Sequence, residues 1–530
     1  MHSSAIAVFL VLFALVTVLG FLAARWRSGD LDRLHEWGLG GRRFGAWITW
    51  FLLGGDLYTA YTFVALPALV FAQGAIGFFA VPYTIICFPL ALLPLPRLWR
   101  VARRHNFVTG ADFVRGRYDS PVLGLLVAIT GILAVMPYIA LQLVGMEVVI
   151  AGLGFPTSGW VGDLPLVVAF VILAAYTYTG GLRAPAVIAV VKDLLIYVTV
   201  AAAVIVIPAR LGGYSKIFAA VPAAKLTLAA PHAGNFGSYS AFATLALGSA
   251  LALFLYPHAL TGTLAAKNPR VIARNMALLP AYSLALGLIA LLGFMALAAG
   301  VAHLPQYAPY FKLYSNNFAV PALFLQSFPG WFVGVAFAAI AIGALVPAAI
   351  MSIAAANLWT RSIYREYFNP RCTEAQEAHQ AKFASLLVTL GALVFAIGLP
   401  TQFAINLQLL GGIWIIQTLP VLVVGLYTRW LHRRALALGW LIGMVMGTWM
   451  EARLGFAGAV YPLHLFGAVV PTYIALATLV VNFVVAALST VLFRMAGLAE
   501  GVDLTAPSDY VSSPTAPAAY APSPSLGTPN

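Results

Sequence analysis

The residues with the clearest chemical potential form a short polar break inside an apolar stretch. Gly54, Gly55 and Asp56 interrupt the run WITWFLLGGDLYTAYTFVALPALVF, and Tyr58 and Thr59 follow directly. A helix unwound at this break would present carbonyl oxygens that bind a cation and N–H groups that bind a carboxylate. The alternative is that the glycine pair allows close helix packing and that Asp56 caps the second half of the helix. An acid this deep in an apolar helix is costly, which favours a binding role.

A second polar group lies in the run PYIALQLVGMEVVIAGLG. On a helix, Tyr138 and Gln142 share a face and Glu147 lies near it, so the three could line a solute cavity. Alternatively, Glu147 is close enough to the outer membrane interface to be hydrated. We interpret Asp56 and Glu147 as the two acids that fall well within apolar segments, and we expect no Lys or Arg deep in such a segment.

A third polar group surrounds the pair Gly411 and Gly412, which is flanked by Gln408 and Gln417. This pattern is typical of a flexible gating helix whose amides bind a polar solute, and packing of small residues explains it equally well. His258, at the end of another apolar segment, either caps the helix end or relays a proton. Serines and histidines occur without a nucleophile motif, so we predict no catalytic residue and no enzyme activity.

These polar groups lie in a chain whose composition is that of a membrane protein. Of its 530 residues, 62% are hydrophobic and 8% are charged, against about 45–50% and about 25% in soluble domains. So few charges exclude a soluble enzyme or a nucleic-acid binder. The net charge of +13 is then a signal of membrane orientation. Two cysteines, Cys87 and Cys372, give no disulfide framework and no metal cluster, and we expect no cofactor.

The apolar segments predict an all-α protein that crosses the lipid bilayer about 13 times, because about 20 apolar residues span a hydrocarbon core. The predicted segments are 5–24, 44–71, 75–96, 121–153, 161–180, 184–208, 238–262, 275–302, 330–358, 383–399, 404–427, 434–450 and 467–493. No strands are predicted. With the N-terminus outside, most of the 29 Lys and Arg residues fall in inward loops. This asymmetry predicts an outer N-terminus and a cytoplasmic C-terminus in the cell membrane.

Several motifs resemble those of the sodium/solute symporter family, which includes proline permease, pantothenate permease and the sodium/glucose transporters. They are the run WGLGGRRFG from Trp37, the GGD break, the loop RRHNFVTGADFVRGRY, the stretch YTYTGGLRAPAVIAVVKD from Tyr176, the pair Pro257-His258 and the run RSIYREY from Arg361. The resemblance covers about Glu36 to Arg494. Details around the break and around Gln142 look closest to the branch that carries monocarboxylates such as pyruvate and lactate.

Membership of this family implies a LeuT-like core of two inverted five-helix repeats, each beginning with a broken helix. The resulting division assigns 1–43 to the first helix and its inner loop, 44–208 to repeat one, 209–237 to an outer loop, 238–428 to repeat two, 429–498 to peripheral helices and 499–530 to a disordered cytoplasmic tail. The tail is also predicted by its Pro- and Ser-rich composition.

The resemblance also implies a sodium site, and here the sequence departs from the family. The expected carbonyl ligands fall on Gly54, Leu57 and Gly343, whereas the two expected hydroxyl ligands fall on Val346 and Pro347, which have no side-chain oxygen. Ser352 would need a shift in register to replace them. Two hypotheses follow: Na+ bound in an altered ligand shell, or H+ taken up by Asp56.

We therefore expect a secondary symporter that imports a small organic anion by alternating access. The predicted substrate is a monocarboxylate, held by half-helix N–H groups and by Tyr58, Thr59, Gln142 and Gln417. A sodium-coupled amino acid or pantothenate permease is the first alternative. A membrane-embedded enzyme is the second, but the long outer loops 209–237 and 303–329 carry no acid that could serve it.

Overall fold

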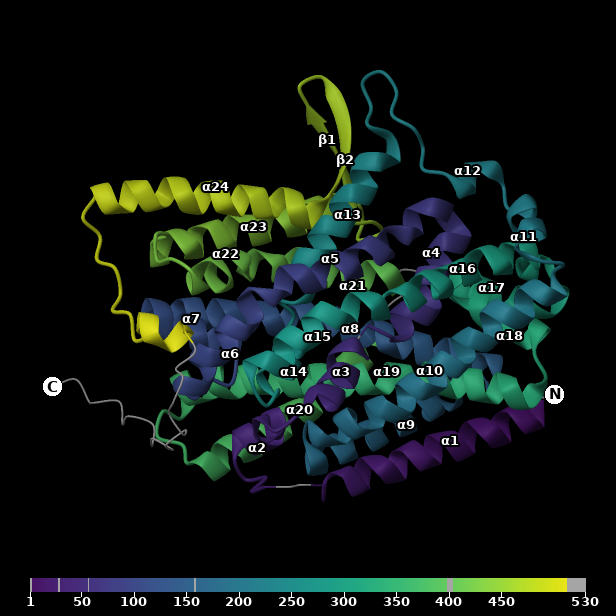
Figure 1. Ribbon diagram of the computed structural model, residues 1–530, viewed down its shortest axis with the longest axis horizontal. Helices are drawn as coiled ribbons and strands as arrows, with labels where there is room; N and C mark the ends of the chain where they lie inside the picture. Colours follow the sequence, from purple (N-terminus) through teal and green to yellow (C-terminus); the bar gives the residue numbers. More distant parts are fainter. Residues whose placement is uncertain (1, 27–28, 56, 157–158, 398–403, 512–530) are drawn as a thin grey trace.

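The computed structural model describes residues 2–26, 29–55, 57–156, 159–397 and 404–511. These residues form a bundle of helices that run largely along the same direction, with a single β-hairpin at one side (Figure 1). Helix α1 (His2–Ala23) begins at the right-hand end of the view, and the short turn η11 (Pro507–Tyr510) lies near the left-hand end. Asp56, central to the predicted site, lies outside the described residues.

The apolar segments become helices because a backbone in lipid must satisfy its own hydrogen bonds. The longest helices are α1, α8 (Pro121–Gly152), α9 (Gly159–Gly180), α10 (Arg183–Arg210), α19 (Gly330–Trp359), α20 (Glu374–Ile397), α23 (Arg433–Arg453) and α24 (Ile474–Met495). In the described part of the chain, nine helices are long and apolar enough to cross a membrane, or ten if one bent pair counts as a span.

The predicted count of 13 spans is therefore not confirmed. Helix α3 (Ala46–Gly54) has nine residues, too few to cross a bilayer alone. The stretch Tyr61–Leu92 counts as one candidate span by length and composition, although its sequence predicts parts of two. The N-terminal part of α20 carries Glu374 and Glu377, which lowers its hydropathy.

Two helices are broken near their middles. Helix α3 ends at Gly54, and the chain resumes with a π-helical turn, η2 (Tyr61–Ala65), that leads into α4 (Leu66–Gln73). Further along, α13 (Gly237–Leu253) and α14 (Pro257–Leu264) meet at an angle of 47°. The predicted interruption after Gly54 is confirmed, and a matching one begins the second half of the core.

Shorter helices complete the core and the loops. On the first half of the chain they are α2 (Leu34–Leu39), η1 (Gly40–Arg42), η3 (Gly74–Phe79), α5 (Ala80–Leu92), α6 (Pro94–Arg104), α7 (Gly110–Tyr118), α11 (Tyr214–Ala220) and α12 (Ala223–Leu226). On the second half they are α15 (Pro269–Tyr282), α16 (Leu284–Ala298), η4 (Val301–His303), η5 (Pro305–Tyr307), α17 (Ala308–Tyr314), η6 (Ser315–Phe318), α18 (Ala319–Ser327), η7 (Thr360–Phe368), α21 (Ala404–Ile415), η9 (Ile416–Thr418), α22 (Leu419–Leu422) and η10 (Val424–Leu426).

A β-hairpin lies between α23 and α24, where the sequence predicted no strand. Strand β1 (Val460–Leu465) pairs antiparallel with β2 (Ala468–Tyr473), so the predicted segment 467–493 becomes helical at Ile474. Two prolines in these strands disfavour a helix, and Gly467, with a φ of 81°, allows the tight turn. Val469 exchanges backbone hydrogen bonds with the loop 234–236. These bonds connect the hairpin to the predicted outer loop 209–237.

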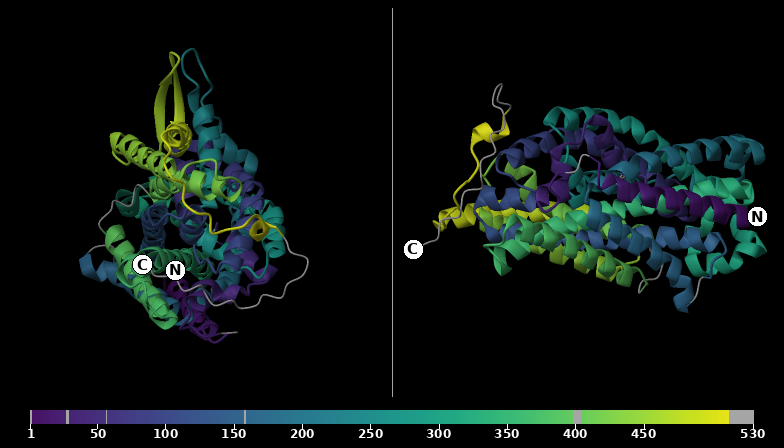
Figure 2. Two further views of the ribbon diagram at one scale, coloured as in Figure 1. Left: turned by 90° about the vertical axis from the view of Figure 1, so that its left-hand side faces the viewer. Right: turned by 90° about the horizontal axis from the view of Figure 1, so that it is seen from below.

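Helix α19 forms the centre of the bundle. It packs against α1, α8 and α10, and nearly all of its residues from Ala336 to Leu358 are buried. Its many alanines and glycines allow these neighbours to approach closely. The end-on view in Figure 2 shows the helices gathered into one bundle, with the β-hairpin projecting from one side. This packing places Gly343 deep in the core.

The segment after α24 folds back onto the loops at the opposite end from the hairpin. The Asp503 carboxylate pairs with Arg117, and that of Asp509 lies 2.9 Å from Arg104 Nε and 2.7 Å from His105 Nε2. Burial opposes ionisation of Asp509, but the Ala506 N–H and His105 outweigh it and lower its pKa. Residues up to 511 of the predicted tail thus dock on the protein, while 512–530 lie outside the described residues.

Candidate ion and solute site at the helix break

The break after Gly54 is built by backbone groups that leave the helical pattern. The Leu57 N–H donates to the Gly54 carbonyl at 2.9 Å, which closes a tight turn. Both glycines meet close neighbours: a methyl group at Gly54 would lie 2.8 Å from Leu279 Cδ2, and one at Gly55 would lie 3.0 Å from Lys192 Nζ. The glycine pair therefore serves close packing as well as the break.

A lysine of the protein itself contacts the open carbonyls of the break. Lys192 Nζ donates to the Gly55 carbonyl and, at 3.1 Å, to the Tyr58 carbonyl. Its third neighbour is Asp193 Oδ1, also at 3.1 Å, and both charged side chains are fully buried. Lys192 lies nine residues into the 28-residue helix α10, about 14 Å from its start and therefore inside the segment that is long enough to cross a hydrocarbon core about 30 Å thick.

Tyrosines surround this buried ion pair. The Tyr282 hydroxyl donates to Asp193 Oδ2 at 2.5 Å, and the Tyr58 hydroxyl donates to the Tyr282 carbonyl. The Tyr58 and Tyr282 rings pack at 4.5 Å, and Tyr197 meets Tyr282 edge-on at 5.7 Å. These contacts link three elements: the break, α10 and the end of α15.

The sequence interpretation missed this pair. It placed no Lys or Arg deep in a span, which Lys192 shows to be wrong, and it counted only Asp56 and Glu147 as internal acids, which leaves out the buried Asp193. Lys192 and Asp193 lie inside the predicted segment 184–208, so their depth was readable from that segment. A charged pair there is costly unless it has partners, and this cost is the signal that could have identified them.

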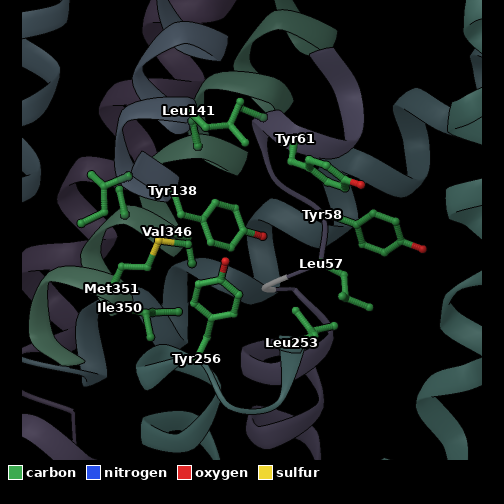
Figure 3. Close-up of a cluster of buried hydrophobic side chains, with 14 of the residues drawn as sticks. Leu57, Tyr58, Tyr61, Tyr138, Leu141, Leu253, Tyr256, Val346, Ile350 and Met351 are labelled. Carbon is green, nitrogen blue, oxygen red and sulfur yellow. The ribbon is translucent and has the colours of Figure 1, made fainter. Parts of the chain in front are cut away.

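Helix α19 faces the break as the sequence predicts, but without hydroxyl groups. A methyl group at Gly343 would lie 3.7 Å from the Tyr58 carbonyl oxygen. Val346 is 1% exposed and packs in an apolar cluster with Leu57, drawn in Figure 3. Ser352 bonds instead to the Ala348 carbonyl at 2.8 Å and to Thr389, so it does not substitute for the missing hydroxyls.

The described residues do not fit a sodium ion at this position. A hard cation needs several oxygen ligands at once. The carbonyls of Gly55 and Tyr58 already accept hydrogen bonds from Lys192, and the Gly54 carbonyl accepts one from the Leu57 N–H. Val346 and Pro347 contribute no oxygen. An ammonium group therefore binds carbonyls of the same break, one residue beyond those at which the resemblance places sodium.

The amide groups that begin the second half of the broken helix are capped by side chains. Gln142 Oε1 accepts from the Ala60 N–H at 3.1 Å, and Gln142 Nε2 donates to the Tyr138 carbonyl at 3.3 Å. Thr59 Oγ1 accepts from the Tyr61 N–H at 3.0 Å. Thr59 and Gln142 thus meet at the half-helix end, where the helix dipole favours negative charge.

Gln417 lies elsewhere. Its Nε2 donates to Thr478 Oγ1 at 2.9 Å, and its Oε1 accepts from Asn482 Nδ2 at 3.1 Å. Both partners belong to α24, a helix outside the two predicted repeats. The structure therefore does not bring Gln417 to the break, because its amide is used to join η9 to α24.

A cavity of about 380 Å³ lies over the second half of the broken helix. Ala65 and Ala68 form its floor, the amides of Gln73, Asn316 and Asn406 contribute polar groups, and its lining residues are uncharged. Its volume falls in the range of about 300–1,000 Å³ typical of small-molecule sites. Its lining begins at Ala65, about one helical turn beyond the half-helix end at Ala60 and Tyr61.

Comparison with known proteins identifies the family. The family model described as the sodium:solute symporter family matches residues 37–447. The chain belongs to the sodium:solute symporter family. A protein named monocarboxylate transport permease protein, from Rhizobium johnstonii (strain DSM 114642 / LMG 32736 / 3841), is 52% identical over 92% of this chain and 96% of its own.

Other members of the family agree. An uncharacterized symporter of Bacillus subtilis (strain 168), YodF, is 34% identical over 84% of this chain and 87% of its own. A solved structure of a Na+-coupled sialic acid symporter, in a substrate-bound outward-open state, matches with a TM-score of 0.71 at 15% identity over 94% of this chain and 99% of its own. That likeness shows the LeuT-like fold.

These findings confirm the resemblance drawn from the motifs. This sodium:solute symporter family member is a multi-pass membrane transporter that couples solute uptake to a cation, and it is not an enzyme. The predictions for the individual binding residues remain predictions. Among the described residues predicted for the site, Tyr58, Thr59, Gln142, Leu57 and Gly343 lie together, and Gln417 does not.

Proposed function

We propose that this protein imports a small monocarboxylate, such as pyruvate or lactate, across the cell membrane. The observation that carries the proposal is the half-helix end at Ala60 and Tyr61, with an uncharged cavity of about 380 Å³ that begins at Ala65 on the same segment. Backbone N–H groups at a helix N-terminus bind carboxylates without a full positive charge. The name of the 52% identical relative supports the same substrate class.

In this proposal the substrate carboxylate binds at the half-helix end alongside the side-chain oxygens, which hold its N–H groups in position for the carboxylate. Thr59 Oγ1 and Gln142 Oε1 hold the amides in the described state, and a carboxylate offers a stronger, charge-assisted acceptor. Tyr58 contributes through its backbone and ring, since its hydroxyl is bonded to Tyr282. Movement of repeat one, 44–208, against the rest then opens the site to each side in turn.

The proposal includes the orientation of the chain. The N-terminus lies outside and the C-terminus in the cytoplasm, because the loops rich in arginine gather at the end where 499–511 docks. Labelling of single cysteines added at residue 2 and after residue 511 in intact cells tests this orientation. Reaction of the first, but not of the second, with an impermeant reagent is expected.

The coupling cation is the second part of the proposal. The family name implies Na+, whereas the replacement of two hydroxyl positions by Val346 and Pro347 raises H+ as the alternative. Uptake at fixed pH with sodium replaced by choline decides between them. Loss of accumulation in choline supports Na+, and unchanged accumulation supports H+.

The substrate class is tested with purified protein and a binding screen. Pyruvate, lactate, acetate, proline and pantothenate are compared by their effect on thermal stability, because a ligand that binds the folded state raises its stability. Stabilisation by the monocarboxylates is expected. Stabilisation by proline or pantothenate alone would support the alternative of an amino acid or vitamin permease.

A further inference from the structure

The Lys192 ammonium group is held as a bound cation would be held. It donates hydrogen bonds to the Gly55 and Tyr58 carbonyls, and Asp193 Oδ1 lies 3.1 Å away as its ion-pair partner. The two carbonyl acceptors are backbone oxygens exposed by the break, the kind of ligand that broken helices use for cations. An ordinary structural ion pair would not need the carbonyls of an unwound helix on another element.

The groups around the Lys192–Asp193 pair come from several elements. Lys192 contacts Asp193 on α10 and the Tyr58 carbonyl at the break, Tyr282 of α15 donates to Asp193, and the Tyr197 ring packs against Tyr58. From α19, Gly343 faces the Tyr58 carbonyl: a methyl group there would lie 3.7 Å from its oxygen, and Gly343 carries no side chain. Asp193 therefore balances the charge of Lys192, and Gly343 adds no ligand beside that carbonyl.

We propose that the Lys192 ammonium is a tethered cation that takes the place of a sodium ion at the helix break, so that transport by this chain requires no sodium there. This inference rests on the proposed function for its transport test, and it specifies the ion at the same site. It also explains the loss of the hydroxyl positions at Val346 and Pro347. A helix that does not bind sodium has no need for them.

The first test uses the unmodified protein in proteoliposomes. Initial uptake of labelled pyruvate or lactate is measured at fixed pH in sodium chloride and in choline chloride. Equal rates are expected, and an inward pH gradient in choline should increase uptake. A rate at least about tenfold lower in choline, equivalent to about 1.4 kcal/mol, would overturn the inference while leaving monocarboxylate transport intact.

The second test measures ion binding without transport. The thermal midpoint of the purified protein is compared in sodium chloride and choline chloride at equal ionic strength. No difference is expected for the wild type. The variant Lys192→Ser frees the two carbonyls and adds a hydroxyl group, so sodium should now raise its midpoint above the value in choline. A control variant, Lys382→Ser, removes a lysine that pairs with exposed Asp32 and should show no sodium effect.

These outcomes separate the inference from the proposed function. A sodium-specific rise for the wild type, or none for a folded Lys192→Ser protein, would overturn the tethered cation. If that variant does not fold, the wild-type measurements still decide the question. If no monocarboxylate is transported in either salt, the proposed substrate is wrong, and the midpoint comparison still tests Lys192.

Discussion

Gln142 connects the half-helix end to the rest of the core, and removing its amide should weaken substrate binding. In the variant Gln142→Leu, the buried Ala60 N–H loses its acceptor at 3.1 Å. An unsatisfied buried donor costs about 1–3 kcal/mol. The side chain is fully buried and Leu has a similar volume, so the loss of the hydrogen bond should dominate over any change in packing.

The effect on transport follows from the position of Ala60. If its N–H helps to bind the substrate carboxylate, a displaced half-helix end loses a charge-assisted hydrogen bond of about 1.5–3 kcal/mol. The KM for lactate should then rise by about 10- to 100-fold, since about 1.4 kcal/mol corresponds to tenfold in affinity. Initial uptake rates in proteoliposomes over a range of lactate concentrations give this value.

Gln417→Leu is the matched control. Gln417 is 1% exposed and also bonds across helices, but to Thr478 and Asn482 of α24. We expect a similar loss of thermal stability for both variants and a rise in KM for Gln142→Leu alone. An unchanged KM in folded Gln142→Leu protein, or an equal rise in Gln417→Leu protein, would refute the role of the half-helix end.

Three further predictions concern other contacts. Asp509→Asn should release residues 499–511 to protease at neutral pH, because it removes contacts worth about 1–2 kcal/mol. Since the pKa of Asp509 is lowered in the folded protein, wild-type docking should persist above about pH 4. It should be lost as the pH falls through the folded-state pKa of Asp509. Val346→Thr should lower the thermal midpoint, because it buries a hydroxyl at a cost of about 1–3 kcal/mol, without making uptake sodium-dependent. Asp193→Asn should destabilise the protein by about 3–5 kcal/mol, because it leaves the buried Lys192 ammonium without its carboxylate. Tyr282→Phe removes one hydrogen bond and should cost about 1 kcal/mol. Equal losses of stability in denaturation experiments would contradict this ranking.

The broken helix was predictable because its signal is local. A glycine pair beside an acid in an apolar run indicates an interrupted helix, and α3 ends at Gly54. The family could likewise be recognised from short motifs. The position of Gly343 beside the break followed from the resemblance, because the repeats of this fold place the two helices side by side.

Other features depend on contacts between distant segments, which the sequence does not display. Lys192 meets the break across 137 residues of chain, and it looked like a loop residue because positively charged residues usually mark the inner side. Gln417 has the composition of a solute-binding residue, but α24 uses its amide. The hairpin at 460–473 was hidden because its apolar residues extend the hydropathy of the helix that follows.

The measurement that tests the central claim most directly is counterflow in proteoliposomes. Vesicles that contain the purified protein are loaded with unlabelled lactate and diluted into a trace of labelled lactate, in sodium chloride and in choline chloride. The account predicts transient accumulation of the label in both salts, abolished by external pyruvate and unaffected by proline or pantothenate. No accumulation in either salt, or competition by proline or pantothenate but not by pyruvate, would contradict it.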